Sequence, residues 1–131
     1  MTSGDQTRFH NVDLDVYATY DLAALAADLE PGAMLLSSDE RDGTYRASFE
    51  LQVQPTDAEP AIRAFAALIE QLPPTARALW DGAARREFSI GIGAGDSPHS
   101  FHLVLSPAVL KLASDVGAAV EFVVYPADAA R

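Results

Sequence analysis

The sequence predicts an α+β fold: a two-layer sandwich in which helices cover one face of a largely antiparallel sheet. Segments of alternating apolar and polar residues, typical of half-buried strands, recur along the chain. Segments with apolar residues at helical spacing separate them, and capping residues or prolines bound these helical segments. The length of 131 residues and the hydrophobic content of 49% suit one domain with a single core over residues 1–131.

The first strand is expected to begin at Phe9, after a frayed lead-in over residues 1–8. Its alternation continues to Tyr20. The side chains that alternation places on its solvent face include Asp13, Asp15 and Tyr17. Asp21 stands where an N-cap is needed for a short helix, which Pro31–Gly32 ends.

A β-hairpin is expected next. A brief strand over Ala33–Ser38 and a longer one over Tyr45–Val53 flank Asp42–Gly43, a dipeptide typical of tight hairpin turns. The longer strand alternates in polarity, and Glu50 falls on the same polar side as Arg46. The hairpin therefore has one face for a core and one for solvent.

The main helix follows the hairpin. Thr56-Asp-Ala-Glu59 matches a capping box, and apolar residues recur at helical spacing from Ile62 to Ile69. Pro73–Pro74 ends this helix. A further short helix is expected from Thr75, with Trp80 in the core or, as the alternative, as a binding anchor.

The last third of the chain predicts a C-terminal strand–helix–strand unit. Alternation over 101–105 predicts a strand that could pair as a hairpin with the strand predicted over 88–93. Ser106 is expected to cap the following helix, and Gly117 to end it in the left-handed conformation. In the final strand, 118–125, the side chains expected to face the helices are Val120, Phe122 and Val124.

Up to Ile92 this order is the βαββαβ order of ferredoxin-like folds, and the C-terminal unit would extend the same sheet. The opposite face of the sheet then carries aromatic and charged side chains. The residues expected to contact a partner on this face are Asp13, Asp15, Tyr17, Glu50, Glu121, Val123 and Tyr125.

The stretch LSPAVLKLASDVGAAVEFVVY resembles the C-terminal signature of the bacterial domain of unknown function 4279 family. Members of that family end in a similar Leu-Ser-Pro, helix, Gly-Ala, strand-Tyr arrangement. The resemblance extends from Val12 through Tyr125, and Leu29-Glu30-Pro31 is similar to the end of the family's first helix. It implies an αβ domain and supplies no catalytic residues.

The net charge of −10 is unevenly distributed. Residues 1–60 contain 12 acidic residues and 3 arginines, whereas residues 61–131 contain 7 acidic and 6 basic residues. Such a field repels nucleic acid and anionic lipid and attracts a basic partner. Nucleic acid and membrane are therefore not expected as partners.

The absence of cysteine excludes disulfides and thiolate metal sites. The N-terminus is polar, and no apolar run approaches the roughly 20 residues of a membrane helix. We therefore expect a cytoplasmic protein.

Two features of the second half suggest chemistry only weakly. Gly91, Gly93 and Gly95 follow a predicted strand, yet GIGAG matches no phosphate-binding motif, so we expect these glycines to let another group approach closely. The spacing of His99 and His102 suits metal ligands on a helix, but in an extended segment they point to opposite faces. We predict no metal site and no cofactor.

Asp13 and Asp15 could divide acid and base roles only where their surroundings separate their pKa values, which is not expected on a solvent-facing strand. Arg77, Arg85 and Arg86 form a basic cluster that suits an anion or partner contact, or a solvated helix end. No serine stands in a Gly-x-Ser-x-Gly motif. The chain is therefore not expected to be an enzyme.

Small size, concentrated acidity and the lack of a catalytic constellation together favour a non-enzymatic protein-interaction domain. Within that class they favour an immunity-type protein that neutralises a basic toxin. The alternative is a small-molecule-binding or catalytic domain that uses the open sheet face or the Gly91–His102 loop. A third hypothesis is a homodimer through the open face, with Tyr17, Val123 and Tyr125 as its apolar centre.

Overall fold

The computed structural model describes residues 6–97 and 99–127 of the chain. The elements are β1 (Arg8–Ala18), α1 (Ala23–Leu29), β2 (Ala33–Arg41), β3 (Thr44–Leu51), α2 (Ala58–Glu70), α3 (Pro74–Asp81), β4 (Arg85–Gly93), α4 (Pro107–Val116) and β5 (Ala119–Tyr125). The sheet order is β2-β3-β1-β4-β5. Every neighbouring pair is antiparallel except β4 and β5, which are parallel. The predicted α+β class with a largely antiparallel sheet is confirmed, and the first four strands have the ferredoxin-like order.

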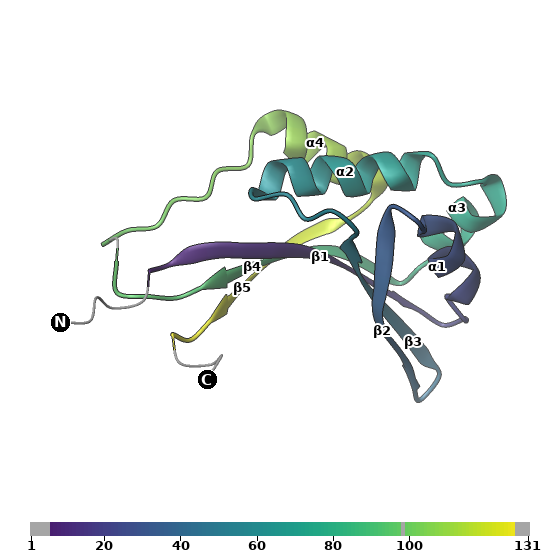
Figure 1. Ribbon diagram of the computed structural model, residues 1–131. Coiled ribbons are helices and arrows are strands. Elements are labelled where there is room, and N and C mark those ends of the chain that lie inside the picture. The colour runs from purple at the N-terminus through teal and green to yellow at the C-terminus, as the bar shows by residue number, and fades with distance from the viewer. Residues whose placement is uncertain (1–5, 98, 128–131) are drawn as a thin grey trace.

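The helices form one layer on one face of the sheet (Figure 1). α2 packs against α4, and α1 packs against α3. The core lies between this layer and the sheet, where Leu14 of β1, Phe65 of α2 and Phe88 of β4 are fully buried. The rings of Phe65 and Phe88 stack with their centroids 5.9 Å apart. This core matches the predicted helical stripe from Ile62 to Ile69, whose two end residues are also fully buried.

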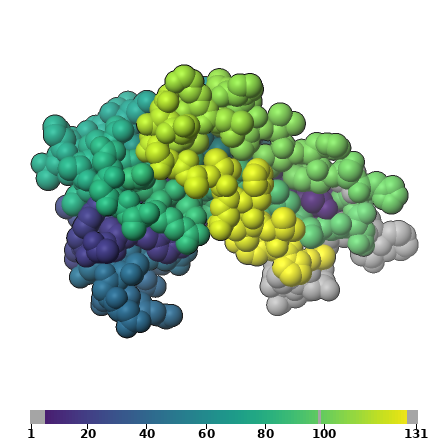
Figure 2. Space-filling model, turned by 180° about the vertical axis from the view of Figure 1, so that it is seen from behind, coloured from purple at the N-terminus to yellow at the C-terminus, as the bar shows by residue number. Residues whose placement is uncertain are grey.

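The opposite face of the sheet carries no helix among the described residues and is concave. The β2–β3 hairpin projects on one side of this face and β5 on the other, so that the twisted sheet forms an arch (Figures 1 and 2). The hairpin turns at Asp42 and Gly43, whose φ angles are 54° and 82°, as the Asp-Gly dipeptide predicts. β2 is longer than the predicted Ala33–Ser38 and reaches Arg41.

The strand predicted over 101–105 does not form. The place beside β4 is taken by β5, and the Ala94 N–H donates to the carbonyl of Tyr125 at 2.8 Å. Residues 101–105 instead run as an extended connection, in which Phe101, Leu103 and Leu105 pack partly buried against the core and Val104 is exposed. The C-terminal unit is therefore β4–α4–β5, with parallel strands, and the predicted second hairpin is wrong.

The ends of α4 are as predicted, and the start of α2 is not. Ser106 Oγ accepts from the Val109 N–H at 3.3 Å, and Gly117 takes a φ of 80°. In α2 the predicted capping box is absent, because the N-cap residue is Asp57 rather than Thr56 and the Asp57 side chain makes no capping hydrogen bond within the described chain. The Glu59 carboxylate accepts instead from the backbone N–H of Ser106, which ties the start of α4 to the first turn of α2.

Two further expectations differ from the structure. The lead-in over 1–8 ends earlier than expected, because β1 begins at Arg8 and the Thr7 N–H donates to the Ser97 carbonyl at 2.7 Å; residues 1–5 lie outside the described chain. In β5, Val120 is half-buried, but Phe122 and Val124 are 51% and 61% exposed. The helices therefore do not cover the second half of β5.

Trp80 is in the core, as predicted, and the binding-anchor alternative is wrong. The side chain is fully buried, and its indole N–H donates to the Val116 carbonyl at 2.8 Å, which links α3 to α4. None of the helices in the described chain has the length and apolar character needed to cross a bilayer.

Candidate functional site

Carboxylates gather at the centre of the open sheet face. Asp15 lies across from Glu87 of β4, and Asp13 lies across from Glu50 of β3. Glu121 of β5 pairs with Ser89, which is the β4 partner of Asp13. Because side chains opposite each other share a face, four strands bring these groups together. We call this group the acidic face: Asp13, Asp15, Glu50, Glu87 and Glu121.

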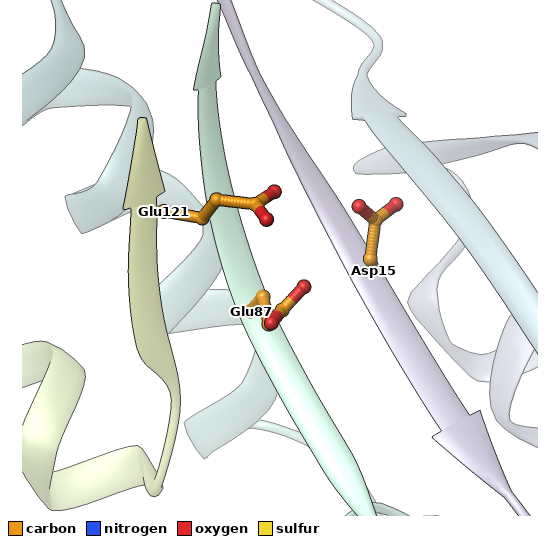
Figure 3. Close-up of side chains that lie close together, drawn as sticks. All are labelled: Asp15, Glu87 and Glu121. Atoms are coloured by element: carbon orange, nitrogen blue, oxygen red, sulfur yellow. The ribbon is translucent and has the colours of Figure 1, made fainter. Parts of the chain in front are cut away.

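Three members of the acidic face approach one another closely. One carboxylate oxygen from each of Asp15, Glu87 and Glu121 lies within 4.8 Å of the other two, and Figure 3 shows the three side chains on the same side of the sheet. Asp15 is only 7% exposed and Glu87 only 6%. Carboxylates this deeply buried need hydrogen bonds or opposite charges to offset their lost hydration.

Each of these carboxylates has such a partner. Ser48 Oγ donates to Asp15 at 2.5 Å, and Ser89 Oγ donates to Glu121 at 3.1 Å. Arg85 Nε donates to Glu87 at 2.6 Å. Asp15 and Glu121 are thus held by hydroxyls from neighbouring strands, and Glu87 is held by a guanidinium of its own strand.

Arginines border the acidic face at the Tyr17 end. Arg46 Nη2 lies 3.6 Å from Asp15 Oδ1. The guanidinium carbons of Arg46 and Arg85 lie 5.6 Å and 5.1 Å from the centroid of the Tyr17 ring. Tyr17 is therefore held between two cations, an arrangement that stabilises both guanidinium groups.

No arginine of the described residues lies this close to Asp13, and the pKa of its carboxyl is raised. Burial, followed by the negative charges of Asp15 and Glu50, raises its pKa from 3.8 to about 6, and the more distant Arg46 lowers it only in part. The expectation that a solvent-facing strand would leave this carboxyl in ordinary surroundings is wrong. The cause is that neighbouring strands bury Asp13 partly and place like charges beside it.

The close group of three could hold a cation by its chemistry. Its ligands are all carboxylate oxygens, which suit a hard divalent ion such as Mg²⁺ or Ca²⁺. Arg46 and Arg85 already lie against two of its members, however, and they supply positive charge from within the chain. The arrangement is therefore a charge network that two arginines neutralise in part, with an excess of carboxylates.

All seven residues predicted to contact a partner lie on the open face, but not in one cluster. Asp13, Asp15, Glu50 and Glu121 belong to the acidic face. Tyr17 lies level with Arg85 at one end of the sheet, whereas Val123 and Tyr125 lie level with Gly91 and Gly93 toward the other end. The predicted apolar centre of an open-face homodimer is therefore absent, because carboxylates occupy the space between its members.

The glycines of β4 make room for neighbouring side chains, as predicted. A Cβ at Gly91 would lie 2.7 Å from Asn11 Oδ1 and 3.5 Å from the Tyr125 ring. A Cβ at Gly93 would overlap the His10 imidazole, which itself packs edge-on against Tyr125 with centroids 6.4 Å apart. These glycines therefore serve packing across the open face.

The predicted basic cluster does not exist in space. Arg77 pairs with Asp81 along α3 at 3.0 Å, and Arg85 turns to Glu87 on the open face. Arg86 points to the helix side, where it donates to the carbonyls of Gly117, Trp80 and Asp81 at 2.8–2.9 Å. Consecutive residues of a strand point to opposite faces of the sheet, so the side chains of Arg85 and Arg86 are far apart although the residues are adjacent in sequence.

Sequence reasoning did not identify Glu87 as a member of the site. The alternation of Phe88, Ile90 and Ile92 in β4 contained the signal, because extending it one residue backward puts Glu87 on the polar side. The identity of its neighbours across the sheet was not available from that pattern.

A hollow lies on another part of the molecule. It has a volume of about 630 Å³ and is lined by the start of β1, the first turn of α2 and residues 101–104, including His102. The ring of His102 lies 3.1 Å from Ser100 Oγ and is exposed, as is His99. Within the described chain, neither histidine belongs to a group of potential metal ligands.

No family model, curated protein or solved structure matches the chain. The resemblance of its C-terminal stretch to the domain of unknown function 4279 family stays a prediction.

Proposed function

We propose that this chain is a non-enzymatic protein-interaction domain whose acidic face binds a basic segment of a partner protein. The observation that supports it is the excess of carboxylates at the centre of a concave sheet. Among these carboxylates, Asp13 has no close arginine within the part of the chain that the structure describes, and its pKa is raised to about 6. A cationic side chain placed there would supply the missing positive charge.

An immunity-type protein that neutralises a basic toxin in the bacterial cytoplasm is the form of this function that we favour. Its support is the charge of −10 on a chain of 131 residues, most of it in the first 60 residues. Complementary charge speeds the encounter with a basic partner and disfavours acidic competitors.

Affinity capture with a matched pair of variants tests the proposal. One variant combines Asp13→Asn, Glu50→Gln and Glu121→Gln on the acidic face. The other makes the same charge change on exposed positions of the helices, with Asp28→Asn, Glu70→Gln and Asp115→Asn. We expect the wild type and the helix-side variant to retain the same basic protein from the native host, and the acidic-face variant to lose it.

Binding of the purified captured protein would then be measured across salt concentrations. We expect the dissociation constant to rise steeply with salt and to increase roughly tenfold or more in the acidic-face variant, since each partly screened charge pair contributes up to about 1 kcal/mol. Binding that ignores both salt and the acidic-face substitutions would contradict the proposal.

The hollow beside His102 favours a second candidate, a small-molecule-binding domain. Its volume of about 630 Å³ falls within the range of ligand pockets. A thermal-shift screen with metabolites, nucleotides, Mg²⁺ and Ca²⁺ tests it, because a ligand at 100 times its dissociation constant stabilises the folded state by about 2.7 kcal/mol. A shift that His102→Ala abolishes would favour this candidate, whereas a shift with Mg²⁺ or Ca²⁺ that Glu121→Gln abolishes would place an ion on the acidic face.

A further inference from the structure

Among the described residues β5 ends the sheet, and no strand pairs with its outer side, which we call the free edge. The Tyr125 carbonyl accepts from Ala94, so the backbone polar groups of Tyr125 face β4. The N–H and C=O groups of successive residues in a strand point to alternate sides. Those of Val120, Phe122 and Val124 therefore point away from β4, toward the free edge.

Apolar side chains accompany this free edge. Phe122 and Val124 pair with the buried Ile90 and Ile92, which places them on the helix side of the sheet, yet they are 51% and 61% exposed. α4 has ten residues and spans about 15 Å. β5 has seven residues and spans about 23 Å, so the helix is too short to cover it. Figure 2 shows β5 uncovered at the surface.

The other edge of the sheet is protected, and this one is not. β2 has a register shift between Leu35 and Ser37 and ends in the charged run Asp39–Arg41, two devices that discourage further pairing. β5 pairs with β4 in unbroken register and contains neither proline nor lysine, and its one charged residue is Glu121. An edge of this kind is a template for another strand.

We propose that β5 pairs with β5 of a second copy of this chain, in antiparallel orientation about a two-fold axis at Phe122. Phe122 then lies opposite its own copy, and Val120 lies opposite Val124 of the second chain. All three residues direct their backbone groups outward, so each pair exchanges both of its hydrogen bonds. The exposed Phe122 and Val124 side chains meet across the interface, on the helix side of a sheet shared by two chains.

The neighbouring registers are less favourable. A two-fold axis at Glu121 places this carboxylate opposite its own copy, which is repulsive. An axis at Val123 places Val120 opposite Pro126, which has no N–H to donate. With the axis at Phe122, Glu121 lies opposite Val123 of the second copy and both problems are avoided.

The dimer has a salt dependence of its own. Each chain carries a net charge of −10, so salt that screens the repulsion between copies favours pairing. Binding of a basic partner to the acidic face would respond to salt in the opposite direction. The dimer does not rest on that proposed function, and the two are distinguishable by this sign.

Sedimentation velocity over a range of protein concentrations tests the pairing. We expect a dimer for the wild type that strengthens with salt, and a dissociation constant raised tenfold or more by Phe122→Lys and by Val124→Pro. The proline removes an outward N–H and no hydrogen bond to β4. Leu36→Lys, at a position 45% exposed on the other edge, is the control that leaves the dimer unchanged. A monomeric wild type at millimolar concentration, or equal effects of Leu36→Lys and Phe122→Lys, would overturn the proposal.

Cysteine cross-linking tests the register, since the native chain has no cysteine. Opposed residues in a non-hydrogen-bonded antiparallel pair have Cα atoms about 4.5 Å apart, within the range of a disulfide. We expect mild oxidation to join Glu121→Cys protein to Val123→Cys protein, and neither variant to itself. Self-cross-linking of Val123→Cys alone would overturn this register in favour of an axis at Val123.

Discussion

The two faces of β1 affect stability in opposite directions. On the helix side Val12, Leu14 and Val16 are completely buried in an apolar core. On the open side Asp15 is largely and Asp13 partly removed from water, but among like charges. Burial of the first set stabilises the fold, whereas burial of the second set costs hydration energy that hydroxyls and arginines offset in part. A strand whose acidic side lowers stability is expected to use that side for binding.

The largest effect is expected from the apolar side of β1. Leu14→Ala should lower the free energy of unfolding by about 2–5 kcal/mol, because it removes buried methyl groups and leaves a cavity. Urea denaturation measures this loss. Thr19→Ala, at an exposed position just after β1, should change stability by less than about 0.5 kcal/mol. Similar losses in the two variants would contradict the assignment of the core.

A smaller loss is expected where a hydroxyl supports the acidic face. Ser48→Ala should lower the free energy of unfolding by about 1.5–3 kcal/mol, because the buried Asp15 carboxylate loses its 2.5 Å hydrogen bond. Ser89→Ala removes a longer bond, 3.1 Å, to the more exposed Glu121 and should cost about 1 kcal/mol or less. Equal losses of stability in Ser48→Ala and Ser89→Ala would show that burial of the Asp15 carboxylate does not depend on the Ser48 hydroxyl.

The smallest expected effect is an increase in the free energy of unfolding, at Asp13. Folding raises the pKa of Asp13 from 3.8 to about 6, so the folded state binds this proton more tightly than the unfolded state. The resulting stabilisation is fully present below about pH 4 and is lost as the pH rises through about 6. Asp13→Asn should therefore be more stable than the wild type at pH 7, by about 1 kcal/mol after allowance for solvent screening.

The pH dependence of that gain is its diagnostic. Urea denaturation between pH 4 and pH 7 should show the difference between Asp13→Asn and the wild type shrinking toward zero as the pH falls. Asp28→Asn, on the exposed side of α1, should give a difference that does not change over this interval. A constant difference for Asp13→Asn would mean that its pKa is ordinary in the folded protein.

Sequence patterns predicted the structural features that depend only on residues close together in the chain. The alternation in β1 assigned Leu14 and Asp13 to opposite faces, and Ser106 and Gly117 marked the two ends of α4. The Asp42–Gly43 turn was equally local. Each of these features depends on residues within a few positions of one another, so the sequence was sufficient for them.

Features that depend on distant neighbours were missed or misassigned. Glu59 was expected to cap its own helix, but it bonds to Ser106, 47 residues away. The alternation over 101–105 is typical of a strand, but β5 occupies the place beside β4 where this segment was expected to pair.

The sequence by itself determined the fold class and the acidic character of the molecule. It also determined which side chains of the central strands face the core and which face away from it. Tertiary structure alone decided that Asp15, Glu87 and Glu121 meet within 4.8 Å, and that Phe122 and Val124 stay exposed on a free edge. The physical reason is that alternation sets which way a side chain points, whereas the order of strands and the length of the covering helix set what it meets.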